Sequence, residues 1–366
     1  MDQATYTYNQ LAIQNDNFTA PGFDITLDGK ELSPVQFHIP NVEVELNGNG
    51  TAGGCSFKIE GQYDYEKSKW INDATKLVKA GATLAVNGGY KKRKELFYGY
   101  VDDFSMEFTH EGTPFISVNG LDGLGYLMNM HETVYAGEKK AKDIIEAVLN
   151  KSKSAGFAKK VTIGTIDPKK FQTPIVKEQV DDWTFLCMMA ERYGATLMAV
   201  DGELIFDDVL TRKSPIVTLE LGKSLRRFSK RVSLAHQVGK VEVFGRDVNQ
   251  KAVSGSANKV TVGGTGKTAS EWVSGLKDSV LRERSEFAQT EQECQLLAQH
   301  RFNSLSMGFV SGEGECIGIP ELIPGRYIKI EGTDKETGGT YFISRVFHRF
   351  SEEGYITSFE VKGAKA

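Results

Sequence analysis

One glycine-rich stretch of the chain has the look of a phosphate-binding loop. Residues 263–268 read Gly-Gly-Thr-Gly-Lys-Thr, and loops of this kind place backbone N–H groups and a lysine around phosphates. The full motif requires a glycine five residues before the glycine of Gly-Lys-Thr, and Thr261 holds that position. A helix should also follow at once, whereas residues 269–276 are poor helix formers. We therefore predict no nucleotide site.

The histidines and acidic pairs do not form a catalytic or metal-binding pattern. The six histidines never fall at ligand spacing, and they are His38, His110, His131, His236, His300 and His348. Three acidic pairs are of interest for glycosidase chemistry, Asp102-Asp103, Asp181-Asp182 and Asp207-Asp208. Neighbouring residues of a strand point to opposite faces, so such a pair is no catalytic dyad, and we read them as turn and cap residues. We predict no catalytic residue, no metal site and no cofactor, and we expect His348 to be a packed or interface residue.

The basic residues leave three readings open. Arg226-Arg227 and Lys230-Arg231 enclose Phe228. Nucleic-acid-binding proteins often alternate basic residues with aromatic residues in this way. The net charge of −4 argues against a general attraction to nucleic acid or anionic membranes. A subunit contact that faces acidic residues is the favoured reading, and a channel lining is the third.

Cysteine use and the N-terminus bear on the compartment. Cys55, Cys187, Cys294 and Cys316 form no CxxC pair, which predicts reduced thiols. Residues 1–14 lack the apolar region of a signal peptide, and no apolar run is long enough to cross a bilayer. We therefore expect synthesis in a reducing compartment, without a signal peptide.

The clearest local signals lie in residues 180–208. Asp181 or Asp182 can cap a helix whose apolar stripe is Trp183, Leu186, Ala190 and Tyr193. Gly194 can end it, and Asp201-Gly202 then predicts a hairpin between residues 196–200 and 203–206. This stretch is thus a small α/β module.

Alternation of apolar and polar residues predicts strands on both sides of that module. Before it, the expected strands cover residues 35–39, 42–46, 55–59, 84–86, 96–101, 104–108 and 115–118, with a basic hairpin tip at 91–94. After it they cover residues 216–221 and 240–245, followed by a run within 325–361. Helices are expected at 70–78, 141–149 and, from a capping box of Thr290 and Glu293, at about 291–306. Residues 253–268 are rich in Gly, Ser and Thr, which predicts a mobile loop.

The C-terminal strands repeat the N-terminal pattern. Gly81-x-x-Leu84-x-Val86-x-Gly88 matches Gly325-x-x-Ile328-x-Ile330-x-Gly332, and aromatics follow at equal distances, Phe97 with Tyr341 and Phe115 with Phe359. A chain of 366 residues has room for two or three domains. We therefore predict a duplicated barrel-like unit with an α/β insert between the copies.

Several segments resemble a known family. They are Thr218–Leu225, Val241–Asp247, Gly318–Gly325, Gly339–Phe350 and Gly354–Thr357. They resemble the phage late-control D proteins, the baseplate hub proteins of contractile tails, and the N-terminal hub portion of VgrG spike proteins. The positions that match the family are Asp182, Trp183, Phe185, Leu186, Gly245, Asp247, Pro320, Pro324, Gly325, Tyr341, Val346, His348 and Tyr355.

The resemblance implies an α+β, mainly β fold with two tube-like β-barrel domains. The expected division is 1–130 for the first barrel, 131–212 for the α/β middle domain and 213–366 for the second barrel. It further implies a non-enzymatic homotrimer, in which six similar domains surround a central channel. One face would dock a six-fold tail tube protein and the other a three-fold spike protein. VgrG chains continue into an OB-fold and a β-helical spike, so we expect the spike here to be a separate polypeptide.

Two other functions stay open at this stage. The first is a tail-associated cell-wall hydrolase, and the second is a β-rich binding module that acts as a monomer. For the hub, tape-measure or other baseplate proteins are further candidate partners, and neither a membrane nor a specific nucleic acid is expected. Assembly would place the protein in the baseplate of a virion or of a related injection particle.

Overall fold

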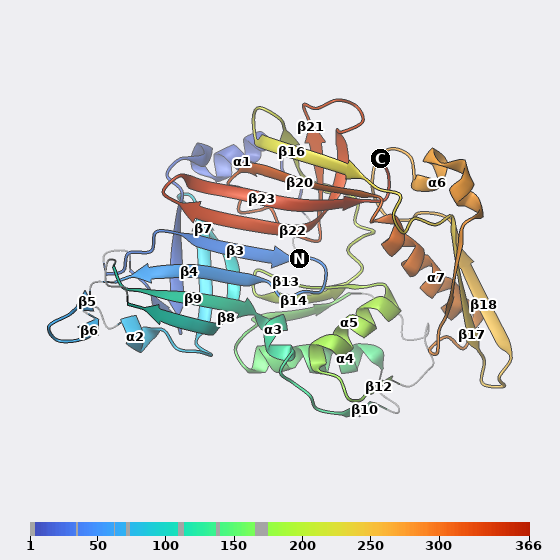
Figure 1. Ribbon diagram of the computed structural model, residues 1–366, viewed down its shortest axis with the longest axis horizontal. Coiled ribbons are helices and arrows are strands. Elements are labelled where there is room, and N and C mark those ends of the chain that lie inside the picture. The colour runs from blue at the N-terminus through green and yellow to red at the C-terminus, as the bar shows by residue number, and fades with distance from the viewer. Residues whose placement is uncertain are drawn as a thin grey trace.

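Hydrogen-bonded strands make up most of this protein. The computed structural model describes residues 4–33, 36–61, 63–70, 74–108, 113–136, 140–164 and 175–366. Most of the strands join into one large sheet, and helices cover smaller units beside it (Figure 1). The predicted fold class, α+β and mainly β, is confirmed, whereas the closure of each half into a barrel stays a prediction.

The main sheet takes its thirteen strands from both ends of the chain. The N-terminal half contributes β1 (Gly22–Leu27), β2 (Lys30–Glu31), β3 (Val42–Asn47), β4 (Gly54–Glu60), β7 (Thr83–Gly89), β8 (Arg93–Glu107) and β9 (Phe115–Asp122). The C-terminal half contributes β15 (Pro215–Glu220), β16 (Leu225–Val232), β20 (Val310–Ile317), β21 (Tyr327–Glu331), β22 (Gly339–Ser351) and β23 (Gly354–Gly363).

The two halves repeat one arrangement of strands. Hydrogen-bonded neighbours follow the order β3-β4-β9-β8-β7-β1 in the first half and β16-β20-β23-β22-β21-β15 in the second, with the same order along the chain. A β-bulge recurs at the same place, between Val101 and Asp103 in β8 and between Ile343 and Arg345 in β22. The halves differ in one pairing, because β1 runs antiparallel to β7 whereas β15 runs parallel to β21. The predicted duplication is therefore present in the strand topology.

Only the first glycine of the predicted repeat is equivalent in the two halves. Gly81 and Gly325 both have left-handed backbone, with φ of 81° and 78°, and each precedes a three-stranded antiparallel meander. The second glycine differs, because Gly88 lies within β7 whereas Gly332 follows β21. A left-handed residue favours glycine, so the shared first glycine has a conformational cause.

The predicted aromatic equivalences are wrong. Phe97 pairs with Val86 on β7. The residue in the place of Val86 is Ile330, which pairs with Gly339 and not with Tyr341. The second match, Phe115 with Phe359, is displaced in the same way. Equal spacing along the chain misled here because the hairpins and bulges of the two halves shift the register.

The smaller unit between the halves agrees with its prediction. Its helices are α3 (Gly123–Leu127), α4 (Ala141–Ser154) and α5 (Asp182–Tyr193), and its strands are β11 (Lys160–Ile163), β13 (Thr196–Val200) and β14 (Glu203–Asp207), with β10 (Val134–Ala136) paired to β12 (Ile175–Lys177). The Asp181 carboxylate accepts the N–H of Thr184 at 2.7 Å, which caps α5. Gly194 ends α5 with φ of 62°, and Asp201 and Gly202 form the hairpin turn with φ of 52° and 70°.

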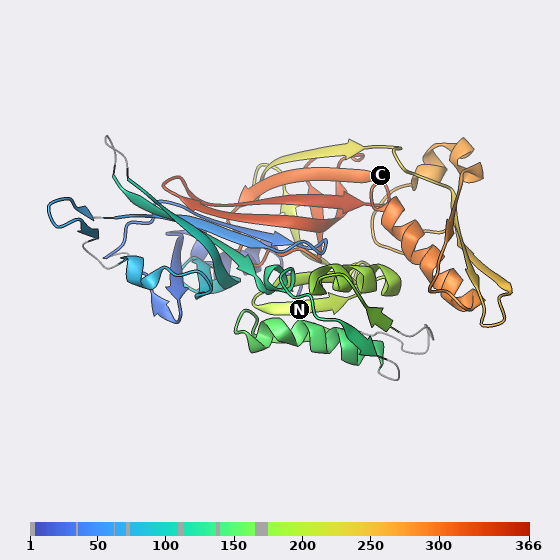
Figure 2. The same cartoon turned by 60° about the horizontal axis from the view of Figure 1, so that its bottom comes forward.

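A second small unit lies within the C-terminal half and corrects one prediction. It pairs β17 (Lys240–Arg246) with β18 (Ala252–Ala257) and β19 (Val280–Arg284), and α7 (Glu291–Ser306) packs on β17 and β18 (Figure 2). Residues 252–257 are thus a strand and not part of a mobile loop. Their small side chains let α7 approach, because a Cβ at Gly255 would lie 2.2 Å from the backbone nitrogen of Gln295.

Other elements depart from the prediction at their ends. Phe37 and Ile39 lie outside any strand, His38 forms an isolated bridge with Glu60, and Val35 is outside the described residues. Trp70 belongs to β6 (Lys69–Trp70), which pairs with β5 (Tyr63–Asp64), and the helix α2 (Ala74–Leu77) is short. The chain begins its described part with α1 (Tyr8–Gln14) and the 3-10 turn η1 (Asp16–Phe18). Asp102 and Asp103 lie inside β8, so they are not turn residues.

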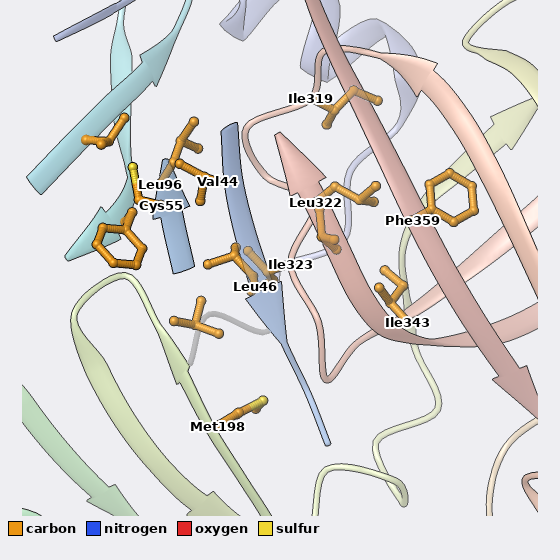
Figure 3. Packing of buried hydrophobic residues seen from close by; sticks show 14 of the residues in the cluster. Val44, Leu46, Cys55, Leu96, Met198, Ile319, Leu322, Ile323, Ile343 and Phe359 are labelled. Carbon is orange, nitrogen blue, oxygen red and sulfur yellow. The ribbon is translucent and has the colours of Figure 1, made fainter. Parts of the chain in front are cut away.

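One internal seam joins the two halves of the main sheet. The second part of β22 pairs with β3 in antiparallel register, from Arg345 opposite Asn47 to Phe350 opposite Val42. One face of this seam is apolar, and Val44 and Leu46 lie between the buried side chains of the two halves (Figure 3). Burial of this face gives both halves a common core.

The other face of the internal seam is held by ion pairs. The Arg345 guanidinium donates to Glu45 through Nε at 2.8 Å and also contacts Glu360. The Arg349 Nε donates to Glu43 at 2.7 Å. These groups are partly exposed, so each pair contributes about 0.5–1 kcal/mol at most.

A buried histidine lies on the apolar face of the same seam. His348 is fully buried, its Nδ1 lies 2.7 Å from the Tyr355 hydroxyl, and its Nε2 lies 3.1 Å from the Leu322 carbonyl oxygen. Burial disfavours the imidazolium and lowers the pKa of His348 from 6.5 to about 3. His348 is therefore the packed residue that its aromatic neighbours predicted.

We expect His348 to make stability fall in acid. The unfolded chain takes up a proton below its ordinary pKa of about 6.5, which the folded chain resists down to about 3. The free energy of unfolding should thus fall as pH drops from 6.5 toward 4. Urea titrations at several pH values give the change of the free energy of unfolding with pH. For His348→Gln this pH slope should be smaller than for the wild type by up to about 1.4 kcal/mol per pH unit. His236→Gln, at an exposed turn, should keep the wild-type slope, and equal slopes for wild type and His348→Gln would refute the assignment.

We expect the charges of the internal seam to be exchangeable. Arg345→Glu would place like charges beside Glu45 and should lower the free energy of unfolding by about 1–2 kcal/mol. Combining Arg345→Glu with Glu45→Arg should recover at least half of that loss. The measurement is chemical denaturation of both single variants and of the double variant. Additive losses in the double variant would show that the pair does not couple.

Candidate assembly interface

Eight strands of the main sheet form a continuous antiparallel strip. They follow the order β16-β20-β23-β22-β3-β4-β9-β8, and Figure 1 shows them stacked from β16 at the top to β8 near the bottom. Within the described chain, β16 has no strand on its outer side, and the second part of β8 has none beyond β9. Each end of the strip therefore presents backbone N–H and C=O groups that a further strand can pair.

The β16 edge is basic and partly apolar. Arg227 and Arg231 are exposed, and Val232 retains 40% of its accessible area. Phe228 instead packs on Tyr341 and Phe359, which fixes β16 to the core. Arg227 approaches Glu313 at 3.7 Å, a weak surface contact that leaves the guanidinium open to a further partner.

The β8 edge is acidic and partly apolar. Asp102, Asp103 and Glu107 are exposed, and Met106 and Phe108 retain 39% and 52% of their accessible area. Since β7 pairs only with the first part of β8, the strand beyond the bulge has one side open in the described structure. Two edges of opposite charge thus lie at opposite ends of one strip.

The residues predicted from the resemblance do not gather in one site. In α5, Asp182 is fully buried and its carboxylate lies 2.6 Å from the Nζ of Lys177 and 2.9 Å from that of Lys151. Trp183 donates its indole N–H to the Gly50 carbonyl oxygen at 2.7 Å, which ties α5 to the loop before β4. Phe185 and Leu186 are buried in the core of the middle unit.

The other predicted positions are turns and core residues of the C-terminal half. Gly245 lies where a Cβ would meet the Ala288 carbonyl oxygen at 2.1 Å, and the Asp247 carboxylate accepts two backbone N–H groups in the turn after β17. Pro320, Pro324 and Gly325 lie in the buried connection to β21. The last four predicted positions, Tyr341, Val346, His348 and Tyr355, are among the buried residues of the β22–β23 hairpin.

A cleft of about 890 Å³ lies between α5 and α7. Arg301 on its wall donates to Glu283 at 2.9 Å, and Asn303 bonds Thr261 at 2.7 Å, so both are engaged within the chain. Among the described residues, no group of three His, Cys, Asp or Glu side chains is placed to hold a metal ion. No described helix has the length and apolar character to cross a membrane.

The glycine-rich stretch 263–268 is tied to the end of the second half. Gly263 donates its N–H to the Tyr327 hydroxyl at 3.0 Å, and Lys267 exchanges two backbone hydrogen bonds with Ala366. The helix that follows, α6 (Ala269–Trp272), has only four residues, and the 3-10 turn η2 (Ser274–Asp278) comes after it. The stretch serves as a packed connection.

The sequence prediction missed β16 as a strand. Its charged residues were read as a basic cluster, and the pattern of one apolar residue among four cations hides the alternation. The signal that was present is the alternation of Phe228, which packs on the core, with Arg227, Ser229 and Arg231, which are exposed. The strand β20 was missed as well, because its glycines and glutamates lack β propensity.

Solved structures share this fold at low sequence identity. The 43 kDa tail protein of prophage MuSo2 from Shewanella oneidensis aligns with a TM-score of 0.69 and 16% identity, over 93% of this chain and 98% of that one. A tail protein from Neisseria meningitidis MC58 aligns with a TM-score of 0.65 and 13% identity, over 94% and 97%. The E. coli c3393 protein, a component of the type VI secretion system, aligns with a TM-score of 0.56 and 12% identity, over 92% and 76%. The predicted likeness to tail and injection proteins is thus confirmed at the level of the fold.

Sequence comparison adds one assignment. No curated protein matches the chain significantly. The family model of the Alg8 N-terminal domain matches residues 18–352, which is most of the chain. The protein therefore belongs to the Alg8 N-terminal domain family.

Proposed function

We propose that this protein is the structural baseplate hub of a contractile phage tail or of a related injection particle. The observation that carries the proposal is the duplication of one six-strand arrangement within a single chain. Three copies of the chain would present six similar modules, which is what a three-fold object needs to meet a six-fold tube. The shared fold with phage tail proteins and a secretion component supports the same reading.

The strip of strands is suited to form the wall of a central channel. One of its faces covers the common core, and the other carries polar side chains such as Lys58, Glu313 and Glu360. If three strips close edge to edge, this polar face surrounds a water-filled opening. The homotrimer would then adapt a six-fold tail tube protein on one face to a three-fold spike protein on the other.

The proposed role requires surfaces and no chemistry. Each chain would divide into a first module of residues 1–130, a middle unit of 131–212 and a second module of 213–366. The family-matching residues described above act in this proposal as packing and turn positions. The hub would be assembled into the baseplate of the particle, with tape-measure or other baseplate proteins as further neighbours.

We expect the purified chain to form a ring of three subunits. Size-exclusion chromatography with light scattering should give a mass of three times 40.4 kDa, and electron microscopy should show six lobes around an opening. A strictly monomeric chain would contradict the hub. A monomer that releases soluble fragments from peptidoglycan would favour the cell-wall hydrolase instead, and an inactive monomer would favour the binding module.

A further inference from the structure

The internal seam between β22 and β3 offers a template for a contact between subunits. The duplication makes β8 the counterpart of β22 and β16 the counterpart of β3. Inside the chain, β22 and β3 pair. Their counterparts β8 and β16 lie at opposite ends of the strip and have no such partner in the described structure.

We propose that β8 of one subunit pairs with β16 of the next in the register of the internal seam. The inference rests on the proposed function, since it names the contact by which the trimer closes. The occupant of each open edge is a second copy of this chain. A head-to-tail contact of this kind joins two different surfaces, so it can close into a ring.

Cross-strand rows fix the register of the proposed pairing. In the N-terminal half, one row of directly paired residues consists of Asp103, Asn119, Ser56 and Glu43. The matching row of the C-terminal half, taken from the equivalent bulge, consists of Arg345, Glu360, Glu313 and Ser229. Ser229 is therefore the counterpart of Glu43, and Arg231 the counterpart of Glu45.

The same rows predict which residues meet across the subunits. Arg349 pairs with Glu43 within the chain, so its counterpart Glu107 should lie opposite Ser229 of the partner subunit. Ser105 should then lie opposite Arg231 of the partner subunit. On the core-facing side, exposed Met106 and half-buried Phe104 would cover apolar surface beside exposed Val232 of the partner subunit.

Charge supports this register. Within the chain, Arg345 bonds Glu45 diagonally across the internal seam. Asp103 takes the place of Arg345, and Arg231 of the partner subunit takes the place of Glu45. The acidic and the basic residue have thus changed sides of the seam. Glu107 would lie diagonal to the same arginine and strengthen the attraction. The internal and external seams thus each join an acidic strand to a basic strand, with the signs reversed.

The reversed signs also discriminate between the two seams. If β16 took the position of β3 beside β22, Arg231 would meet Arg345, and two cations would face each other. If β8 approached β3, Asp103 would meet Glu45. Wrong pairings between modules are therefore penalised by like charge, whereas both correct pairings are attractive.

Disulfide cross-linking in the full chain tests the register. Ser105→Cys combined with Arg231→Cys places two thiols directly opposite each other, within the Cα separation that a disulfide requires. Mild oxidation should yield covalent trimers on non-reducing gels. The matched control combines Ser105→Cys with Arg227→Cys. Arg227 lies four residues before Arg231 on the same face of β16, roughly 13 Å along the strand, so this pair should cross-link far less. Each single cysteine variant reports the background from the native thiols.

Charge exchange provides a second readout by light scattering. Asp103→Arg alone and Arg231→Asp alone should each raise the concentration at half-assembly by roughly 10-fold or more, and the double variant should restore assembly. Glu352→Arg, in the exposed turn after β22, is the control and should assemble as wild type.

The outcomes separate this seam from the hub itself. A trimer that cross-links equally in the control pair, or that ignores both charge reversals, overturns the β8–β16 seam but leaves the hub intact. A chain that stays monomeric and forms no cross-link at high concentration overturns both.

Discussion

The backbone groups along a strand edge set the main constraint on this molecule. Every strand inside the strip from β16 to β8 has hydrogen-bonding partners on both sides, whereas in the described structure β16 and the part of β8 beyond its bulge are paired on one side. Exposed edges of this kind invite pairing with another chain, and proteins either block them or use them. Neither β16 nor β8 contains a proline that would block its edge. The duplication accounts for the two open edges. Inside the chain, β3 of one half already pairs with β22 of the other, and their counterparts β16 and β8 are left for a further partner.

Stability and specificity lie on different faces of the strip. The face toward the core carries Val44, Leu46 and Val346, whose burial supplies most of the driving force that holds the two halves together. The opposite face carries Arg345, Arg349 and their carboxylate partners, which contribute little energy while partly exposed. Their value is to fix which strand pairs with which and in what register. The β8 and β16 edges also have apolar residues on one face and charged residues on the other. In the proposed ring, the charges would select one partner strand among similar modules.

The sequence allowed prediction wherever the signal was local. The helix α5 and its hairpin were predicted closely, because Asp181, Gly194 and Asp201-Gly202 each determine the backbone within a few residues. The duplication was predicted from a short glycine pattern, of which only Gly81 and Gly325 are equivalent. For the basic cluster at Arg226–Arg231 the sequence left three readings open, and the favoured one, a subunit contact, stays a prediction.

The remainder depends on contacts between distant parts of the chain. The register of β22 on β3 joins residues about three hundred positions apart, and no local pattern encodes it. The bulges in β8 and β22, which set the register of the repeat, have no distinctive residue type. The small residues of β18 predict a loop, whereas it is the helix packed on this strand that requires them, and that contact exists only in three dimensions.

Hydrogen exchange of the edge amides shows whether β8 and β16 pair with another subunit on assembly. The chain would be studied above and below the concentration at which it assembles, with exchange followed for residues 103–107 and 225–232. We expect strong protection of both segments in the assembled state and fast exchange in the dissociated state, while β3 and β22 stay protected throughout. Equal exchange of the two edge segments in both states would contradict this pairing.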